Sequence, residues 1–503
     1  MPARPPHAIF IGVIVALFAF GALAAFADGV QSGSTTATAA ATLADSSPPG
    51  GTGQTATGTP GDPAAPAAPG STATPGPSGP SASSDAAPTG VTFSSTSAAV
   101  SGVEQVWVSV LSATPQTSDD VNPGMTQAAV QTAISQLNSY WSAQSNGIVT
   151  IQLAGFETRS LGQSSCDPNA ALASEESSAF GGMFAGDAWK GTHEHLLILS
   201  AESCGADSFA TVGGAGGEIF SGNGIGTTEG IPYLLHEFGH NLGFEHADAS
   251  ICTNTTTYDG ATTAFSFTST VCPTREYDDY FDIMGYTVKN ATPNLSSPQR
   301  ILSGWLTNYA TLTNSTHSTT STLTALGGNG GTQALKVIDP LDGDAYYIEY
   351  RTDSGLDATS AEFHYGLQCD PAMSGYTICE LDSNPSTGDV RVLRVLSFPG
   401  TDAEGTTVMA TGLTAGSTDK TKRHTHLNSG DSFTSVDGGF TMHVVSMSPS
   451  AGASISVTFG AAPISTPTPV YTTVPAPMQA PSPATAPAQP VSITARGVFR
   501  FGV

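Results

Sequence analysis

Apolar and polar positions alternate regularly between about residues 103 and 460, and the two ends of the chain lack this patterning. Residues 103–111 alternate with a period of two and are rich in β-branched side chains, which predicts a β-strand. From Met125 to Gln144 the apolar residues recur at helical spacing, so we expect a helix packed on a sheet. Two further strands are expected at residues 148–154 and 195–200.

A second helix is predicted around residues 236–240, so the first half of the pattern is strand, helix, strand, strand, helix. This order is typical of an α/β arrangement. From about residue 307 the pattern changes to short β-type runs separated by Gly, Asn and Asp, which indicates a β-sandwich-like domain. The clearest runs are residues 334–338, 345–350, 390–396, 440–445 and 455–459.

The predicted second helix opens the stretch HEFGHNLGFEHAD at residues 236–248. His236 and His240 are four residues apart, so their rings lie on one helix face and can converge on one ion. Gly243 permits a backbone turn that returns His246 as a third ligand. Three neutral imidazoles with one open position form the ligand set of a catalytic zinc, and Glu237 can reach a water molecule held there.

This stretch resembles the long zinc signature of the metzincin metallopeptidases, HExxHxxGxxH. The later run Asp282-Ile-Met-Gly-Tyr286 resembles the Met-turn of the same family, and the flanking residues look most like its gametolysin-type branch. The resemblance implies an α/β (α+β) catalytic domain with Zn²⁺ on the three histidines and Met284 beneath the metal. It also implies that Tyr286 faces the zinc, and that residues 212–224 form an edge strand that pairs with substrate.

The function implied is that of an exported zinc endopeptidase acting on extracellular proteins or peptides. Glu237 would act as the general base toward the attacking water and then pass the proton to the leaving amine. Two rivals remain open: a catalytically silent surface or adhesion protein stabilised by zinc, and a zinc hydrolase of a non-peptide amide or ester. The resemblance leaves the natural substrate and the oligomeric state open.

Length and composition divide the 503 residues into folded and unpatterned parts. The net charge of −26 argues against binding to nucleic acid or to an anionic membrane surface. We expect a signal segment, a low-complexity Ala/Ser/Thr/Pro/Gly linker or pro-segment, a zinc peptidase domain, a β-rich domain and a Pro/Ala/Thr-rich tail. Their expected ranges are residues 1–27, 28–90, 91–306, 307–460 and 461–503.

The first segment predicts export. Residues 8–27 are apolar, follow Arg4 and end in Ala-Phe-Ala, which is typical of a secretory signal with a cleavage site. The same run is long enough to span a bilayer, so an uncleaved N-terminal anchor is the alternative and the one expected membrane contact. Either reading places the rest of the chain outside the cytoplasm.

The six cysteines are expected to form disulfides, because an exported chain meets an oxidising environment and no CxxC zinc spacing occurs. Proximity along the chain favours the pairs 166–204, 252–272 and 369–379, which is one of fifteen possible pairings.

Two other histidine pairs, His193 with His195 and His424 with His426, alternate along the chain. Each pair lacks a third ligand in the sequence, so we expect surface residues rather than metal sites. The glycine-rich residues 212–224 show no nucleotide-binding context, and a surface loop is the alternative to an edge strand. Sequons for N-glycosylation begin at four asparagines, Asn254, Asn290, Asn294 and Asn314.

Overall fold

The computed structural model describes the two patterned halves of the chain. The predicted signal segment, the linker, the tail and the sequons at Asn254, Asn290 and Asn314 lie outside the described residues. Among the described residues no helix is both long and apolar enough to cross a membrane. The described residues are 100–113, 125–186, 188–202, 204, 208–213, 215–222, 224–227, 230–253, 259–261, 265–266, 269–286, 291–313, 318–371, 378–381, 383, 385–397, 404–409, 411 and 423–460.

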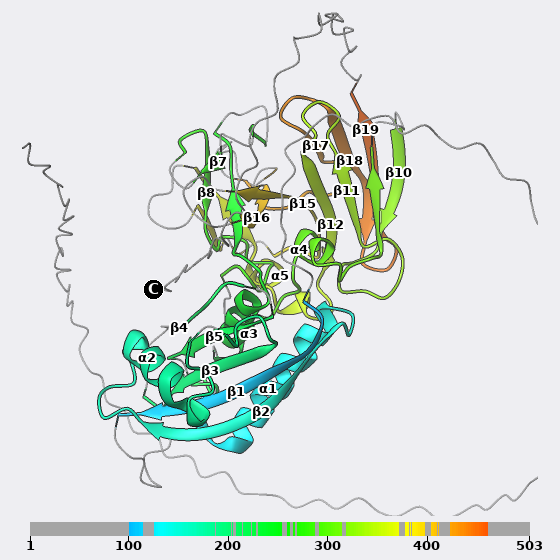
Figure 1. The fold of residues 1–503 in the computed structure, drawn as a ribbon. Coiled ribbons are helices and arrows are strands. Elements are labelled where there is room, and N and C mark those ends of the chain that lie inside the picture. The colour runs from blue at the N-terminus through cyan, green and yellow to red at the C-terminus, as the bar shows by residue number, and fades with distance from the viewer. Residues whose placement is uncertain are drawn as a thin grey trace, which may run out of the picture. The chain divides into compact units, whose positions relative to one another are not determined.

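The first half is built on a five-stranded sheet with the order β2-β1-β3-β5-β4 (Figure 1). The first four of these strands run parallel, and β4 pairs antiparallel with β5 at the edge. Parallel neighbours require crossover connections, which the helices of this half supply. The strands are β1 (Gly102–Ser112), β2 (Val149–Ser160), β3 (Glu194–Ser200), β4 (Ser208–Ala210) and β5 (Gly216–Ser221).

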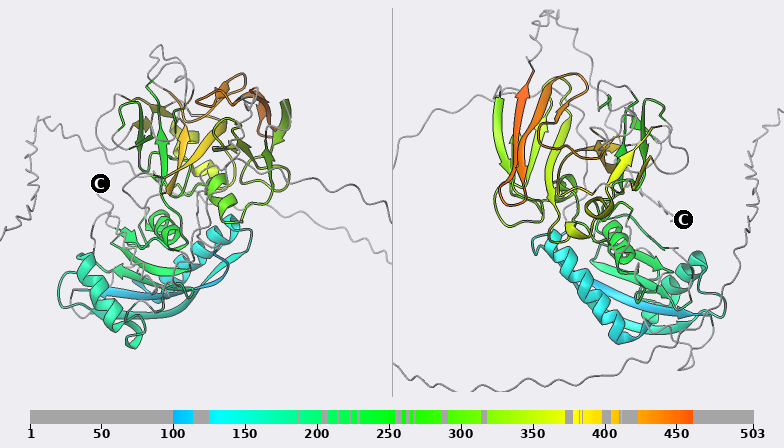
Figure 2. Two further views of the ribbon diagram at one scale, coloured as in Figure 1. Left: turned by 45° about the horizontal axis from the view of Figure 1, so that its top comes forward. Right: turned by 180° about the vertical axis from the view of Figure 1, so that it is seen from behind.

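Helices cover both faces of this sheet. On one face α1 (Gln127–Gln144) and α3 (Gly230–Asn241) share one apolar core with the strands, and the view from behind shows them next to each other (Figure 2). On the other face α2 (Pro168–Ser178) packs with Phe184, Trp189 and Phe220. The sheet therefore forms the middle layer of three, as expected when parallel strands are buried on both faces.

The apolar residues that recur at helical spacing in α1 form the surface by which this helix packs on the core. Thr126 caps its first turn by accepting a hydrogen bond from the Ala129 amide, and Gly147 (φ 79°) lies just after its end. Tyr140 and Trp141 are buried, and the Tyr140 hydroxyl donates to the carbonyl of Pro293. Each large buried side chain of this kind contributes about 2 kcal/mol to folding.

The second half contains two packed sheets. A four-stranded sheet has the order β10-β19-β18-β17, and an eight-stranded sheet has the order β7-β8-β6-β16-β15-β12-β11-β9. Both contribute to one apolar core, in which Tyr346 and Ile348 of one sheet meet Phe433 and Val444 of the other. This packing agrees with the predicted sandwich-like β-domain.

The strands of these sheets are β6 (Ala247–Ser250), β7 (Phe265–Ser266), β8 (Cys272–Arg275), β9 (Tyr309–Leu312), β10 (Ser318–Leu323), β11 (Ala334–Ile338), β12 (Ala345–Thr352), β15 (Gly388–Ser397), β16 (Glu404–Met409), β17 (Ser432–Thr434), β18 (Phe440–Ser448) and β19 (Gly452–Phe459). Smaller elements are α4 (Ser297–Leu302), α5 (Ala361–Tyr365), two 3₁₀ turns, η2 (Ala179–Gly181) and η4 (Asp357–Thr359), and the hairpin strands β13 (Leu367–Cys369) and β14 (Cys379–Leu381).

The eight-stranded sheet crosses residue 306, where the sequence pattern changes. Strand β6 immediately follows His246 and lies between β8 and β16, and it pairs in parallel with β16. Strands on both sides of residue 306 therefore share one sheet.

The structure confirms the predicted elements of regular pattern and corrects the expectation for the glycine-rich residues 212–224, an edge strand or a surface loop. Within this stretch, residues 216–221 form a fully buried inner strand between β3 and β4. Gly217 explains the difference, because an added Cβ would lie 2.6 Å from Nδ2 of Asn241, on the zinc-signature helix. The glycines thus mark close packing of α3 on the sheet.

All six cysteines pair as predicted, as Cys166–Cys204, Cys252–Cys272 and Cys369–Cys379. Three disulfides are typical of a protein that folds in an oxidising compartment. The one described sequon residue, Asn294, is buried and accepts a hydrogen bond from Gln144, so a glycan does not fit there in the folded chain.

Candidate metal centre

Helix α3 holds the first two predicted ligands deep in the molecule. His236 and His240 are 1% and 2% exposed, and the helix around them is apolar because it packs on the sheet beside α1. The helix ends at Asn241, and Gly243 has a φ of 93°, which a residue with a side chain adopts only with strain. The chain turns there and brings back His246, which is 4% exposed.

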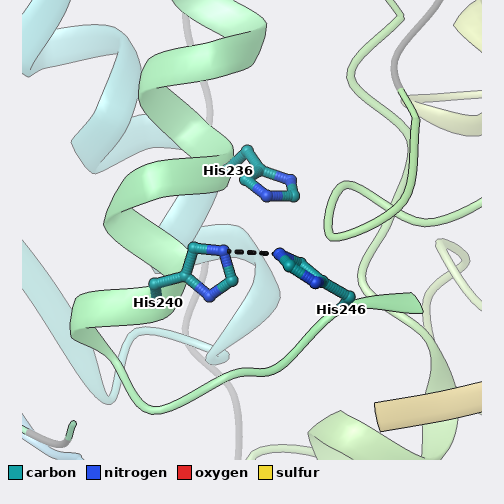
Figure 3. A group of neighbouring side chains, drawn as sticks. All are labelled: His236, His240 and His246. Carbon is teal, nitrogen blue, oxygen red and sulfur yellow. Dashed lines mark hydrogen bonds between the residues drawn. The ribbon is translucent and has the colours of Figure 1, made fainter. Parts of the chain in front are cut away.

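The three imidazoles converge on one point (Figure 3). Their nearest ring nitrogens all lie within 4.8 Å of one another. The ring centroids of His236 and His240 are 4.8 Å apart, and the ring of His246 lies 4.8 Å from that of His240 and 5.5 Å from that of His236. The structure therefore brings together the three residues that the sequence spacing selects.

Each of the three rings uses its Nδ1 atom for a contact outside the cluster. His236 donates from Nδ1 to the carbonyl of Ile283 at 2.9 Å, and His240 donates from Nδ1 to the carbonyl of Phe244 at 2.8 Å. His246 donates from Nδ1 to a carboxylate oxygen of Glu276. A carbonyl only accepts, so the proton of each neutral ring is on Nδ1 and its Nε2 carries a lone pair.

Two of these lone pairs face each other. Nε2 of His240 and Nε2 of His246 are 3.1 Å apart (Figure 3). Two acceptors at this distance repel unless a cation lies between them or one ring takes up a second proton. Burial lowers the pKa of His240, one ring of this pair, so a second proton is unfavourable there. It also lowers the pKa of the neighbouring His236 to about 3. The donor set therefore fits a divalent ion such as zinc.

Glu237 lies beside the cluster without a hydrogen-bond partner for one of its oxygens. The residue is 1% exposed, and its buried Oε1 atom has no hydrogen bond. Burial raises the pKa of this carboxyl well above its usual range. A buried oxygen of this kind is placed to accept a proton or to hold a water molecule.

Met284, in the turn formed by residues 282–286, lies directly against helix α3. A Cβ added at Gly239 would lie 2.4 Å from Sδ of Met284, so this helix and the turn touch through the glycine. Asp282 shapes the turn by accepting hydrogen bonds from the amides of Met284 and Ser296. Burial, together with the charge of the nearby Asp279, raises the pKa of Asp282 to about 7.

The aromatic residue beside the histidines is Tyr277, which the sequence motifs did not indicate. Its ring centroid lies 3.9 Å from that of His246 and 5.8 Å from that of His236. Burial raises the pKa of Tyr277 strongly, and the charges of Glu276 and Glu237 add to the effect. Tyr286 was predicted to face the metal. Its amide donates a hydrogen bond to the Tyr277 carbonyl, and its ring packs against the ring of Tyr280.

Two further clusters of described residues have metal-ligand geometry. One consists of Glu362, His424 and His426, all buried, and the other of Asp339, Asp342 and Asp437, of which two are exposed. The expectation that His424 and His426 are surface residues is therefore wrong, because both are 4% exposed. Their third partner comes from a distant part of the chain, which spacing alone does not reveal.

The other histidine pair is also only partly exposed. His195 is fully buried. Its Nε2 atom forms a hydrogen bond with Glu104 at 2.8 Å, and its Nδ1 atom forms one with Asn241 at 3.0 Å. His193 is half-exposed and forms a hydrogen bond with the same Glu104. The surface expectation is thus wrong for His195, which supports the end of α3 from the sheet.

Comparison with known proteins gives little. No protein family and no curated protein matches the sequence. Among solved structures, one described as "Structure of a chaperone-substrate complex" aligns with 29% of this chain at 15% identity and a TM-score of 0.20. This chain spans about a quarter (24%) of that chain, and so low a similarity carries no conclusion about fold or function.

Proposed function

We propose that the chain is an exported zinc-dependent endopeptidase whose catalytic half is metzincin-like. The observation that carries the proposal is the pair of Nε2 lone pairs of His240 and His246, 3.1 Å apart, with the unpartnered Oε1 of Glu237 on the same helix. The order of ligands along the chain and the contact between Gly239 and Met284 support the resemblance to the metzincin zinc helix and Met-turn.

The residues present fit a catalytic zinc. All three Nδ1 atoms are held by oxygen acceptors, which fixes the tautomer and aims Nε2 at the ion, as outer hydrogen bonds do in zinc sites. Zn²⁺ bound there would polarise a scissile carbonyl and lower the pKa of a water molecule toward neutrality.

The chain's own residues supply the proton transfers. Glu237 follows His236 directly, so its carboxylate can take the proton of the attacking water and deliver it to the leaving amine. Burial raises the pKa of Glu237, and a carboxylate with a raised pKa holds an accepted proton more strongly than an exposed one. Tyr277 keeps its proton because its pKa is raised, so its hydroxyl is a hydrogen-bond donor for the oxygen of the former carbonyl.

Strand β4 is the best candidate to hold an extended substrate. It is the outer strand of the described sheet at the end next to β5, to which helix α3 also packs, and only its inner side pairs with β5. An extended peptide can add to such an edge through main-chain hydrogen bonds. This assignment replaces the earlier expectation for residues 212–224.

The test pairs metal content with turnover for the full chain. We expect wild type and Glu237→Gln to hold equal amounts of zinc, and Glu237→Gln to cleave casein about 10²- to 10⁴-fold more slowly, as loss of a general base does. A chelator should stop wild-type cleavage. Glu380→Gln is the matched control, because Glu380 is exposed on β14 and should cleave as wild type does.

Other outcomes would contradict the proposal in distinct ways. If wild type holds zinc but cleaves no protein, even after residues 28–90 are removed, a zinc-stabilised binding protein becomes the better description. Cleavage of small amides without cleavage of casein would favour a non-peptide hydrolase.

A further inference from the structure

A second buried cluster of metal-ligating side chains lies in the β-rich half. Glu362 comes from α5, and His424 and His426 come from the extended segment 423–427. Their donor atoms lie within 4.8 Å of one another, and the three residues are 0%, 4% and 4% exposed. The two imidazole rings lie side by side, with centroids 4.5 Å apart.

Several polar atoms of this cluster are buried without a hydrogen bond. Both carboxylate oxygens of Glu362 and the Nδ1 atom of His426 have no hydrogen-bond partner. His426 Nδ1 is only 3.1 Å from Glu362 Oε1, but the direction of the contact does not suit a hydrogen bond. Buried polar atoms without partners cost a folded chain free energy, so such a concentration of them calls for a ligand.

Asp389 of strand β15 lies next to the cluster. The residue is fully buried, and its Oδ2 atom has no hydrogen bond. Its Oδ1 atom accepts from the hydroxyl of Ser386 and lies 3.8 Å from His426 Nδ1. A further buried carboxylate thus lies beside His426, next to the three clustered side chains.

His424 is oriented as the histidines of the first site are. Its Nδ1 atom donates to the carbonyl of Leu367 at 3.0 Å, as His236 and His240 donate to carbonyls. This bond puts the proton on Nδ1, so Nε2 is the ligating atom of His424.

We propose that Glu362, Asp389, His424 and His426 bind a second divalent transition-metal ion, most simply zinc, in a closed structural site. Two imidazole nitrogens disfavour Ca²⁺ and Mg²⁺, which take oxygen ligands. Ligands of a tetrahedral zinc are roughly 3.3 Å apart, and four protein ligands leave no open position for substrate. The 3.1 Å and 3.8 Å separations at His426 bracket that value.

The arrangement without a metal leaves the charges unbalanced. A protonated His426 would face two buried carboxylates, those of Glu362 and Asp389. The nearby Arg391 donates through its two terminal nitrogens to Glu349 and Asp279 instead. A divalent ion balances the two carboxylates and occupies the atoms that lack hydrogen bonds.

The site would link three segments of the chain through their side chains. The backbone of segment 423–427 already pairs with Cys369, Val390 and Thr411 through isolated bridges, each made of two hydrogen bonds. A metal would add links from this segment to α5 and β15, next to the Cys369–Cys379 disulfide.

The test counts metal in the purified full-length chain after dialysis against metal-free buffer. We expect two zinc ions per chain in wild type and one in His236→Ala/His240→Ala, in which the second cluster is intact. Glu362→Gln/His426→Gln should also hold one. His364→Gln is the matched control, because it changes an exposed histidine of the same helix and should keep both ions.

Folded His236→Ala/His240→Ala protein that holds no zinc would overturn the inference, with folding judged by circular dichroism. This readout is independent of peptidase activity, so it stands even if the proposed function fails. Cobalt loaded into the same variant should give visible absorption bands of tetrahedral Co²⁺, and these should disappear when Glu362→Gln/His426→Gln is added. Bands that survive this addition would place the ion elsewhere and refute the assignment.

Discussion

At the scale of single residues, the first metal site is defined by what lies behind each ligand. Ile283 and Phe244 accept from two of the histidines through backbone carbonyls, whereas Glu276 accepts from His246 through a carboxylate. A carboxylate behind the ring makes the imidazole a stronger ligand than a carbonyl does. His246 is therefore the one histidine of the three that a side-chain carboxylate holds through Nδ1.

Tyr277 and Tyr286 can be separated by mutation. We expect Tyr277→Phe to lower kcat by about 10- to 100-fold, because a donor to developing charge is lost. Tyr286→Phe should stay within about twofold, because its ring packs on Tyr280 rather than on a histidine. Zinc content should be unchanged in both variants, measured beside steady-state cleavage. The reverse pattern would restore the role that the family resemblance gives Tyr286.

The grouping of the three histidines was predictable because it follows from spacing within a short stretch of sequence. Four-residue spacing places His236 and His240 on one helix face, and Gly243 allows the return of His246. Glu276 and Tyr277 follow strand β8, thirty residues after His246, and belong to no motif. Their approach to the site depends on the pairing of β6 with β8, which one sequence does not reveal.

At the scale of elements, helix α3 packs closely against its neighbours at a glycine, Gly239. Gly239 faces Met284 and also Trp141 of α1, whose ring atoms would lie 3.1 Å from an added Cβ. Helix α3 therefore contacts both α1 and the turn that contains Met284 at Gly239, where the absence of a side chain allows the close approach.

Gly239→Ala tests this contact. We expect it to lower the free energy of unfolding by about 1–3 kcal/mol, the usual cost of overpacking a core. Met284→Ala in the same chain should recover part of the loss because it removes the nearer atom. Gly213→Ala is the control, since its Cβ would meet nothing within 4 Å and should leave stability unchanged. Equal stability of Gly239→Ala and wild type in denaturant titration would contradict the contact.

Elements were predictable where side chains alternate and not where glycine replaces them. Strands β11 and β12 match their predicted runs closely, since burial imposes a period of two. Strand β5 contains Gly216 and Gly217, which carry no side chain to reveal burial, and its inner place in the sheet depends on Asn241.

At the scale of the whole molecule, a buried ion pair and several hydrogen bonds connect residues 278–281 to the β-rich half. Asp279 pairs with Arg391 of β15, and Arg351 of β12 donates to the carbonyl of Phe281. Asp278 accepts from the amides of Ile378 and Cys379. Residues after 306 therefore stabilise the segment 278–281, which lies close to the three-histidine cluster in the chain.

This dependence predicts the behaviour of a shortened chain. We expect residues 91–306 alone to lack cooperative unfolding and to bind zinc much more weakly than residues 91–460, because β6 loses its partner β16 and Asp279 loses Arg391. Breaking one buried pair alone costs about 3–5 kcal/mol. Calorimetry and zinc titration of both chains check this. Cooperative unfolding of the shorter chain at an unchanged midpoint would contradict it.

The change of pattern at residue 307 was visible in the sequence, but the pairing across it was not. Composition and periodicity report what each segment buries, whereas the partner of β6 lies more than 150 residues further along. Only the three disulfides could be inferred over distance, because cysteines are few and the favoured pairs lie near each other in sequence.

The pairing of β6 with β16 also fixes when the first metal site can be completed. The carbonyl of His246 accepts from the amide of Thr406, so the backbone of the third ligand is held by a strand that is synthesised long after the helix carrying the first two. A chain emerging from the ribosome or crossing a membrane has both α3 histidines well before that strand arrives. The order of synthesis thus delays completion of the three-histidine cluster until most of the chain has been made.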